Sequence, residues 1–246
     1  MRPFFKNPRR RFGTLAAALA LASMGFAGCR ATNAVGPAAS SSGDGAPGGA
    51  FVALLGYSNT LGTAEAVARL GYEGFFAPEQ DIRRGQKLLI DRPGDLREHL
   101  VRALRGQVEY AERTGRTIGA VWWQIGIRRQ QNPMPSEAQR RAADRLVTLL
   151  EEMLPGVALY VSPMTPYEGH ECAGAGPSGP AASAVLADAL ARTHAHVRRV
   201  PAFPPLRREE TRDGCHPTDE VYLRNARALV ASFETLRARD GERSGK

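Results

Sequence analysis

Three residues near opposite ends of the chain have side chains suited to nucleophilic catalysis. Ser58 follows the apolar run 51–56 within the segment GYSNTLG, where a strand is expected to end and a helix to begin. Asp213 and His216 lie three residues apart in the segment DGCHP, before a long amphipathic stretch. At this spacing the carboxylate can bind one ring nitrogen of the imidazole, which leaves the other free to act as a base. A serine opposite that nitrogen would complete a serine hydrolase triad; a helix cap and a simple turn are the plainer alternatives.

Apolar patterning indicates which elements would bring these residues together. Continuous apolar runs predict buried strands, and segments with one apolar face predict helices, whereas residues 71–93 are expected to be mostly loop. The predicted strands are 51–56, 118–127 and 157–161, and the predicted helices are 63–70, 95–113, 136–153, 182–196 and 220–236. Strands that alternate with helices at this spacing predict an α/β fold with three layers, α/β/α, around a central parallel sheet.

In such a sheet the carboxyl ends of the strands meet at one edge, and ligands bind in the loops that follow them. This places Ser58, residues 124–129 and residues 162–172 at the same edge. Segment 162–168, SPMTPYE, is a candidate wall of a substrate cleft, although an ordinary loop explains it as well. His194 and His196 do not predict a metal site, because imidazoles two residues apart on a helix diverge and no cysteine or carboxylate pattern accompanies them.

The two blocks GYSNTLG and DGCHP, in this order at the two ends of a domain, resemble those of the SGNH (GDSL-like) hydrolases. That family has a Gly-x-Ser after its first strand and an Asp-x-x-His-Pro before its last helix. The resemblance implies a flavodoxin-like α/β/α fold and an ester hydrolase that needs neither a metal nor an organic cofactor. It also implies that Ser58 is the nucleophile, His216 the general base and Asp213 the residue that orients the base.

The middle of the chain fits the family less well. The resemblance implies that a glycine and an asparagine donate hydrogen bonds to the oxyanion, and Gly85 is the first choice for the glycine, with Gly74 second. No asparagine stands at the end of the strand WWQIGIRR, where Gln124 and Arg128 are the available donors. Losing one such donor commonly costs 10²–10³ in rate. Either a side chain has been substituted, or the enzyme is slow, or catalysis has been lost; Tyr57 in place of the family's aspartate matters less.

The N-terminus has the layout of an export signal. Five basic residues come first, the short apolar stretch 15–24 follows, and the sequence FAGC ends at Cys29. The stretch is too short to cross a bilayer as a helix, and its flanks are those of a secretory signal. FAGC resembles a bacterial lipobox, which implies that residues 1–28 are removed and that Cys29 carries the lipid. An ordinary signal peptide with an incidental cysteine is the alternative.

Composition divides the rest of the chain. Residues 29–50 are rich in Ala, Gly, Ser and Pro and are expected to form a flexible tether; residues 51–236 are enough for one domain, and residues 237–246 form a polar tail. Five of the 33 basic residues precede Cys29, which leaves 28 against 25 acidic residues in the expected mature chain. This near balance gives no reason to expect a nucleic-acid partner.

The remaining cysteines, Cys172 and Cys215, form an even pair for an oxidising compartment, so a disulfide is expected between them. Two free buried thiols are the alternative. Together these features predict a serine ester hydrolase in the cell envelope, tethered to a membrane through Cys29. Its substrates would be esters such as acylated envelope polysaccharides or lipids. A catalytically inactive binding or assembly lipoprotein of the same fold is the rival hypothesis.

Overall fold

The computed structural model describes residues 49–83, 85, 88–90 and 94–244. The predicted signal peptide, Cys29 and nearly all of the expected tether lie outside the described residues. The strands are β1 (Ala50–Leu55), β2 (Thr117–Gln124), β3 (Ala158–Ser162) and β4 (Val197–Arg199). The helices are α1 (Ser58–Arg69), α2 (Glu79–Ile82), α3 (Leu96–Thr114), α4 (Glu137–Met153), α5 (Gly179–Thr193), the short 3-10 helix η1 (Arg208–Glu210) and α6 (Asp219–Ser244).

The four strands form one parallel sheet in the order β1-β2-β3-β4. On the outer side of β1, Val52 makes a single parallel bridge with Phe76 and donates its N–H to the carbonyl of Phe75 at 2.8 Å. The chain therefore leaves β1 toward one side, makes this bridge, and returns to add β2 on the other side. A change of direction of this kind opens a crevice at the carboxyl ends of the two strands, where α/β proteins bind ligands.

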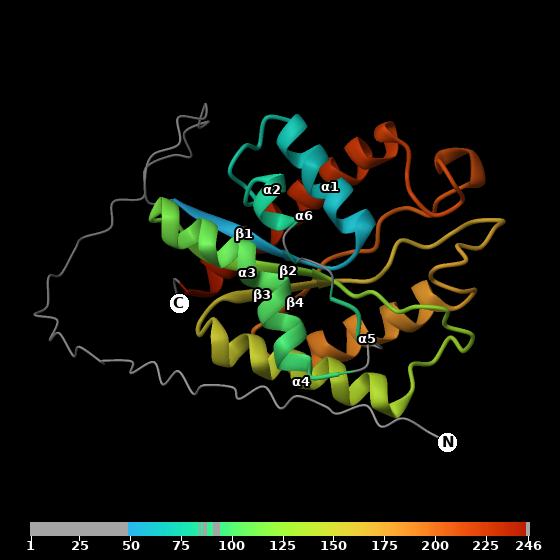
Figure 1. The fold of residues 1–246 in the computed structure, drawn as a ribbon, viewed down its shortest axis with the longest axis horizontal. Helices are drawn as coiled ribbons and strands as arrows, with labels where there is room; N and C mark the ends of the chain where they lie inside the picture. The colour runs from blue at the N-terminus through green and yellow to red at the C-terminus, as the bar shows by residue number, and fades with distance from the viewer. Residues whose placement is uncertain (1–48, 84, 86–87, 91–93, 245–246) are drawn as a thin grey trace, which may run out of the picture. The chain divides into compact units, whose positions relative to one another are not determined.

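Helices cover both faces of the sheet, as expected of an α/β/α arrangement (Figure 1). Helices α1 and α6 pack on one face and enclose Trp122, whereas α3, α4 and α5 pack on the other and enclose Trp123. Both indoles are fully buried, because consecutive side chains of β2 point to opposite faces. Helix α1 lies so close to α6 that a Cβ atom at Gly62 would stand 2.4 Å from the ring of Tyr222.

The elements differ from the predictions mainly at their ends. Helix α1 begins at Ser58 and not at residue 63, since the polar residues of its first turns are buried and hide the apolar periodicity. Helix α4 starts next to the predicted first residue, Ser136, whose hydroxyl caps the helix by accepting the N–H of Gln139. Helix α6 continues to Ser244, into the segment predicted as a tail. Strand β4 was not predicted, because its three residues are too few to show a pattern of apolar side chains. None of the helices among the described residues is long and apolar enough to cross a membrane.

Candidate active site

Ser58 is held at the carboxyl edge of the sheet by a tight connection between β1 and α1. Only glycine fits at position 56, because a Cβ atom there would lie 2.3 Å from the Thr60 hydroxyl. That hydroxyl accepts the N–H of Tyr57 at 3.0 Å and donates to Gln124 Oε1 at 2.8 Å. Thr60 thereby ties the start of α1 to the end of β2, and the Ser58 side chain is left exposed at the first position of the helix.

Ser58, His216 and Asp213 form one chain of hydrogen bonds. The Ser58 Oγ lies 2.9 Å from His216 Nε2, and His216 Nδ1 lies 2.7 Å from Asp213 Oδ2. When Nδ1 carries the ring proton, it donates a hydrogen bond to the carboxylate, and Nε2 is left as an acceptor for the serine hydroxyl. These are the distances and the order of contacts that a nucleophile, its base and the orienting acid require.

The second oxygen of Asp213 fixes the loop itself. Oδ1 accepts the backbone N–H groups of His216 at 2.8 Å and of Cys215 at 2.9 Å. The hydrogen bond from the His216 amide, followed by those from its ring and from the Cys215 amide, holds the pKa of the Asp213 carboxyl well below its usual range. Asp213 therefore stays ionised at neutral pH, and its negative charge is directed at the imidazole.

The loop that carries His216 is anchored at Cys215. Cys215 forms the predicted disulfide with Cys172, across a sequence separation of 43 residues. The carbonyl oxygen of Cys215 accepts two hydrogen bonds, one from Asn59 Nδ2 at 3.2 Å and one from the Tyr167 hydroxyl at 3.0 Å. The loop that carries the candidate histidine is thus attached to α1 through Asn59 and, through Tyr167 and Cys172, at two points to the loop after β3.

A pocket of about 490 Å³ opens beside Ser58 and His216. Its wall is mostly apolar and includes Leu89, Ile127 and Met164, and Arg128 adds a positive charge. None of the described residues that line it is acidic. Segment 162–168 does form part of the wall, through Met164 and Tyr167, as one of the two sequence interpretations expected.

One wall of this pocket is built from two loops joined by backbone hydrogen bonds. The N–H of Arg129 donates to the carbonyl of Gly174 at 3.0 Å, and that of Gln130 donates to the carbonyl of Ala175 at 2.8 Å. Arg129 has a φ of 48°, an unusual value for a residue with a side chain, directly after Arg128. Gly176 leaves no room for a side chain, since a Cβ atom there would lie 2.6 Å from the carbonyl oxygen of Gln130.

Two of the predicted oxyanion donors do not reach the pocket. The N–H of Gly85 bonds to the carbonyl of Ile82 at 3.2 Å, and a Cβ atom there would lie 1.9 Å from the carbonyl oxygen of Arg102. Gly85 is therefore a site of close packing against α3. Gly74, the second choice, binds Arg116 through its carbonyl oxygen and is likewise absent from the pocket lining.

Gln124 is completely buried behind the site. Its Oε1 accepts the Thr60 hydroxyl, and its Nε2 donates to the carbonyl of Pro163 at 3.2 Å. Its amide joins the start of α1 to the loop after β3, so Arg128 is the member of the predicted donor set that lines the pocket. The sequence interpretation did not single out Asn59, whose position next to Ser58 on α1 was the available signal.

The predicted helix 182–196 ends earlier, at Thr193, so His194 and His196 follow α5 and do not stand on it. Their rings lie 6.0 Å apart, and His194 Nε2 contacts Asp144 at 3.2 Å. No group of three or more potential metal-binding side chains gathers anywhere in the described part of the chain.

Neither a scan against models of known protein families nor a search of curated proteins finds a match for this chain.

The disulfide leads to a prediction about stability. Replacing both Cys172 and Cys215 by serine should lower the free energy of unfolding by about 4 kcal/mol, because the open loop gives the unfolded chain more freedom. Urea denaturation of the domain produced in an oxidising compartment measures this difference. A reductant should destabilise the wild type and leave the double variant unchanged. Two free thiols in the exported protein, found by mass spectrometry, would contradict the pairing.

Proposed function

We propose that this protein is a serine ester hydrolase of the SGNH type that transfers an acyl group through Ser58. The observation that carries the proposal is the chain of hydrogen bonds from Ser58 through His216 to Asp213, located beside a pocket at the carboxyl edge of a parallel sheet. The resemblance of GYSNTLG and DGCHP to the two end blocks of the family supports the same assignment.

The geometry suits a two-step acyl transfer. Ser58 Oγ attacks the ester carbonyl while His216 Nε2 removes its proton, and the same nitrogen then protonates the departing alcohol. A covalent acyl-Ser58 ester remains. Water, deprotonated by His216, attacks this ester and releases the acid and the free serine. Asp213 keeps the His216 ring in the required orientation, and its negative charge stabilises the imidazolium that forms when His216 takes the proton.

The oxyanion would lie against the start of α1. The backbone N–H groups of Ser58 and Asn59 stand in the first turn of the helix, where no intrahelical acceptor exists, and the helix dipole adds a partial positive charge. Arg128 would be the third donor, from another part of the pocket wall. A cationic guanidinium would then replace the neutral amide that the family places there.

A second candidate function is that of a non-catalytic binding lipoprotein with the same fold. The absence of an asparagine at the end of β2, together with the buried position of Gln124, favours it. In a binding protein Ser58 would not react as a nucleophile, so covalent labelling of Ser58 distinguishes the two functions.

Fluorophosphonate labelling tests the proposed nucleophile. The purified domain should be labelled at Ser58, because His216 activates this hydroxyl, and Ser58→Ala should abolish both labelling and hydrolysis of 4-nitrophenyl acetate. Thermal unfolding of the variant should match that of the wild type, since this side chain is exposed. A wild type that shows neither labelling nor hydrolysis of a broad panel of esters would favour the binding protein.

Two substitutions should separate proton transfer from oxyanion binding. Asp213→Asn should lower kcat by as much as about 10⁴-fold, since the imidazole loses its tautomer and its counter-charge. Arg128→Ala should lower kcat by roughly 10²–10³-fold with little change in KM, because its contact strengthens only in the transition state.

Profiles of kcat/KM against pH distinguish these effects. Arg128→Ala should keep the wild-type profile, because this residue takes no part in proton transfer, whereas Asp213→Asn should alter it. Arg141, an exposed residue of α4, provides a matched arginine-to-alanine control. Full activity of Arg128→Ala would contradict the assignment of Arg128 to the oxyanion site, without contradicting the proposed triad.

We also propose that Cys29 anchors the enzyme to a membrane of the cell envelope, on the basis of the FAGC motif alone. Cys29→Ser should move the protein from the membrane fraction to the soluble fraction or stall its processing, because the acyl chains that hold it would be absent. Cell fractionation with mass spectrometry of the N-terminus makes the comparison. A variant that partitions and migrates like the wild type would contradict the anchor.

A further inference from the structure

The peptide group that joins Cys215 to His216 is bound at both of its ends. Its carbonyl oxygen accepts hydrogen bonds from Asn59 Nδ2 at 3.2 Å and from the Tyr167 hydroxyl at 3.0 Å, and its N–H donates to Asp213 Oδ1 at 2.8 Å. A peptide group is planar and stiff, so contacts at its oxygen and at its nitrogen together fix the orientation of the plane. They therefore fix the point from which the His216 side chain leaves the backbone.

The backbone on the other side of His216 is held as well, because the carbonyl oxygen of this residue accepts the N–H of Arg212 at 2.8 Å. Rotation about the side-chain bonds of His216 is the freedom that remains, and Asp213 Oδ2 restricts it by binding Nδ1 at 2.7 Å. The distance from His216 Nε2 to the Ser58 hydroxyl, 2.9 Å, then depends on how firmly the preceding carbonyl group is held.

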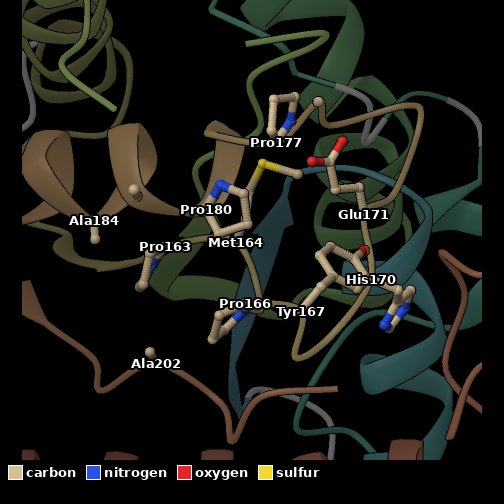
Figure 2. A pocket seen from close by; sticks show the side chains of 12 residues that line it. Pro163, Met164, Pro166, Tyr167, His170, Glu171, Pro177, Pro180, Ala184 and Ala202 are labelled. Atoms are coloured by element: carbon tan, nitrogen blue, oxygen red, sulfur yellow. The ribbon is translucent and has the colours of Figure 1, made fainter. Parts of the chain in front are cut away.

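The Tyr167 hydroxyl reaches this carbonyl group from a well-supported loop. The backbone of Tyr167 makes a parallel bridge with Leu206. In this bridge the N–H of Leu206 donates to the carbonyl of Pro166 at 2.9 Å, and the N–H of Glu168 donates to the carbonyl of Leu206 at 2.8 Å. The Tyr167 ring lies beside that of His170, edge to face, with the ring centroids 5.3 Å apart (Figure 2). Backbone and ring are both held, so the hydroxyl is presented to the loop at a fixed place.

Asn59 is the second donor to the same carbonyl group, but its other contacts make its role harder to isolate. Its side chain is buried, its Oδ1 accepts the Tyr222 hydroxyl at 3.4 Å, and its backbone lies in the first turn of α1, beside the proposed position of the oxyanion. Tyr167 offers the simpler comparison, because a phenylalanine keeps the ring in the wall of the pocket and removes the donor.

We propose that Tyr167 is a positioning residue for the reaction at Ser58, whose hydroxyl holds the Cys215 carbonyl so that His216 Nε2 stays in contact with the nucleophile. The inference rests on the proposed function and adds to it a residue from the loop after β3. Tyr167 acts through His216 and transfers no proton itself. Because His216 serves as the base in both acylation and deacylation, loss of this support should slow both steps together. The effect therefore belongs to kcat, and KM keeps its value.

Tyr167→Phe tests this role in the full-length domain. Its kcat for 4-nitrophenyl acetate should fall roughly 3- to 10-fold, the loss expected when one hydrogen bond no longer holds the base, with KM unchanged. Labelling of Ser58 by a fluorophosphonate should slow by a similar factor, because it needs the same contact between His216 and Ser58. Steady-state kinetics and the time course of labelling measure the two effects.

Tyr110→Phe is the matched control. The Tyr110 hydroxyl, on α3, accepts a hydrogen bond from Arg116 Nη1 at 2.9 Å, and Tyr110 is outside the lining of the pocket at Ser58. Both variants lose a partly buried hydrogen bond of a tyrosine hydroxyl, so both should show a similar, small decrease in the midpoint of thermal unfolding. At temperatures where both are fully folded, Tyr110→Phe should keep the wild-type kcat and labelling rate.

The outcomes separate the positioning role from the proposed function. If the wild type hydrolyses the ester and Tyr167→Phe keeps its kcat and labelling rate, or changes KM alone, the positioning role is overturned while the hydrolase remains. An equal loss of kcat in Tyr110→Phe would also overturn it, since the loss would then follow from stability. If the wild type is neither labelled nor active on any ester, the proposed function falls and the positioning role falls with it.

Discussion

The carbonyl group and the side chain of Cys215 hold the candidate site together. One residue before His216, this cysteine is bonded covalently to Cys172, and its carbonyl oxygen accepts hydrogen bonds from Asn59 and Tyr167. These contacts join the loop before α6 to the helix that begins at Ser58. An imidazole on an untethered loop would contact the serine hydroxyl only part of the time, and the proposed reaction would need that contact in every turnover.

Charge at the site is arranged around the same loop. Asp213 binds two backbone N–H groups of its own loop with one oxygen and the imidazole with the other, so its negative charge is fixed on the far side of the base from Ser58. On the near side lies the start of α1, where the helix dipole gives a partial positive charge, and Arg128 lines the same pocket. In the proposed reaction, negative charge that develops on a substrate oxygen would be stabilised by such groups.

The sequence was sufficient for the features encoded by neighbouring residues. The three predicted strands, the start of the helix near residue 136 and the pairing of Asp213 with His216 depend on local patterns, and the structure has them all. Gly85 and Gln124 depend on what the fold brings against them. Gly85 packs against the backbone of α3, and the Gln124 amide binds α1 and the loop after β3. Neither contact can be anticipated from spacing along the chain.

Tyr167 connects the candidate active site with the loop after β3. It lines both the pocket at Ser58 and a neighbouring hollow of about 330 Å³, and its hydroxyl holds the carbonyl group next to His216. Burial raises the pKa of Tyr167 to about 12, so the hydroxyl keeps its proton and remains a donor at neutral pH. The side chain that lines both hollows also holds the carbonyl group next to His216. A ligand packed against the Tyr167 ring would therefore contact a residue that anchors the loop with the candidate base.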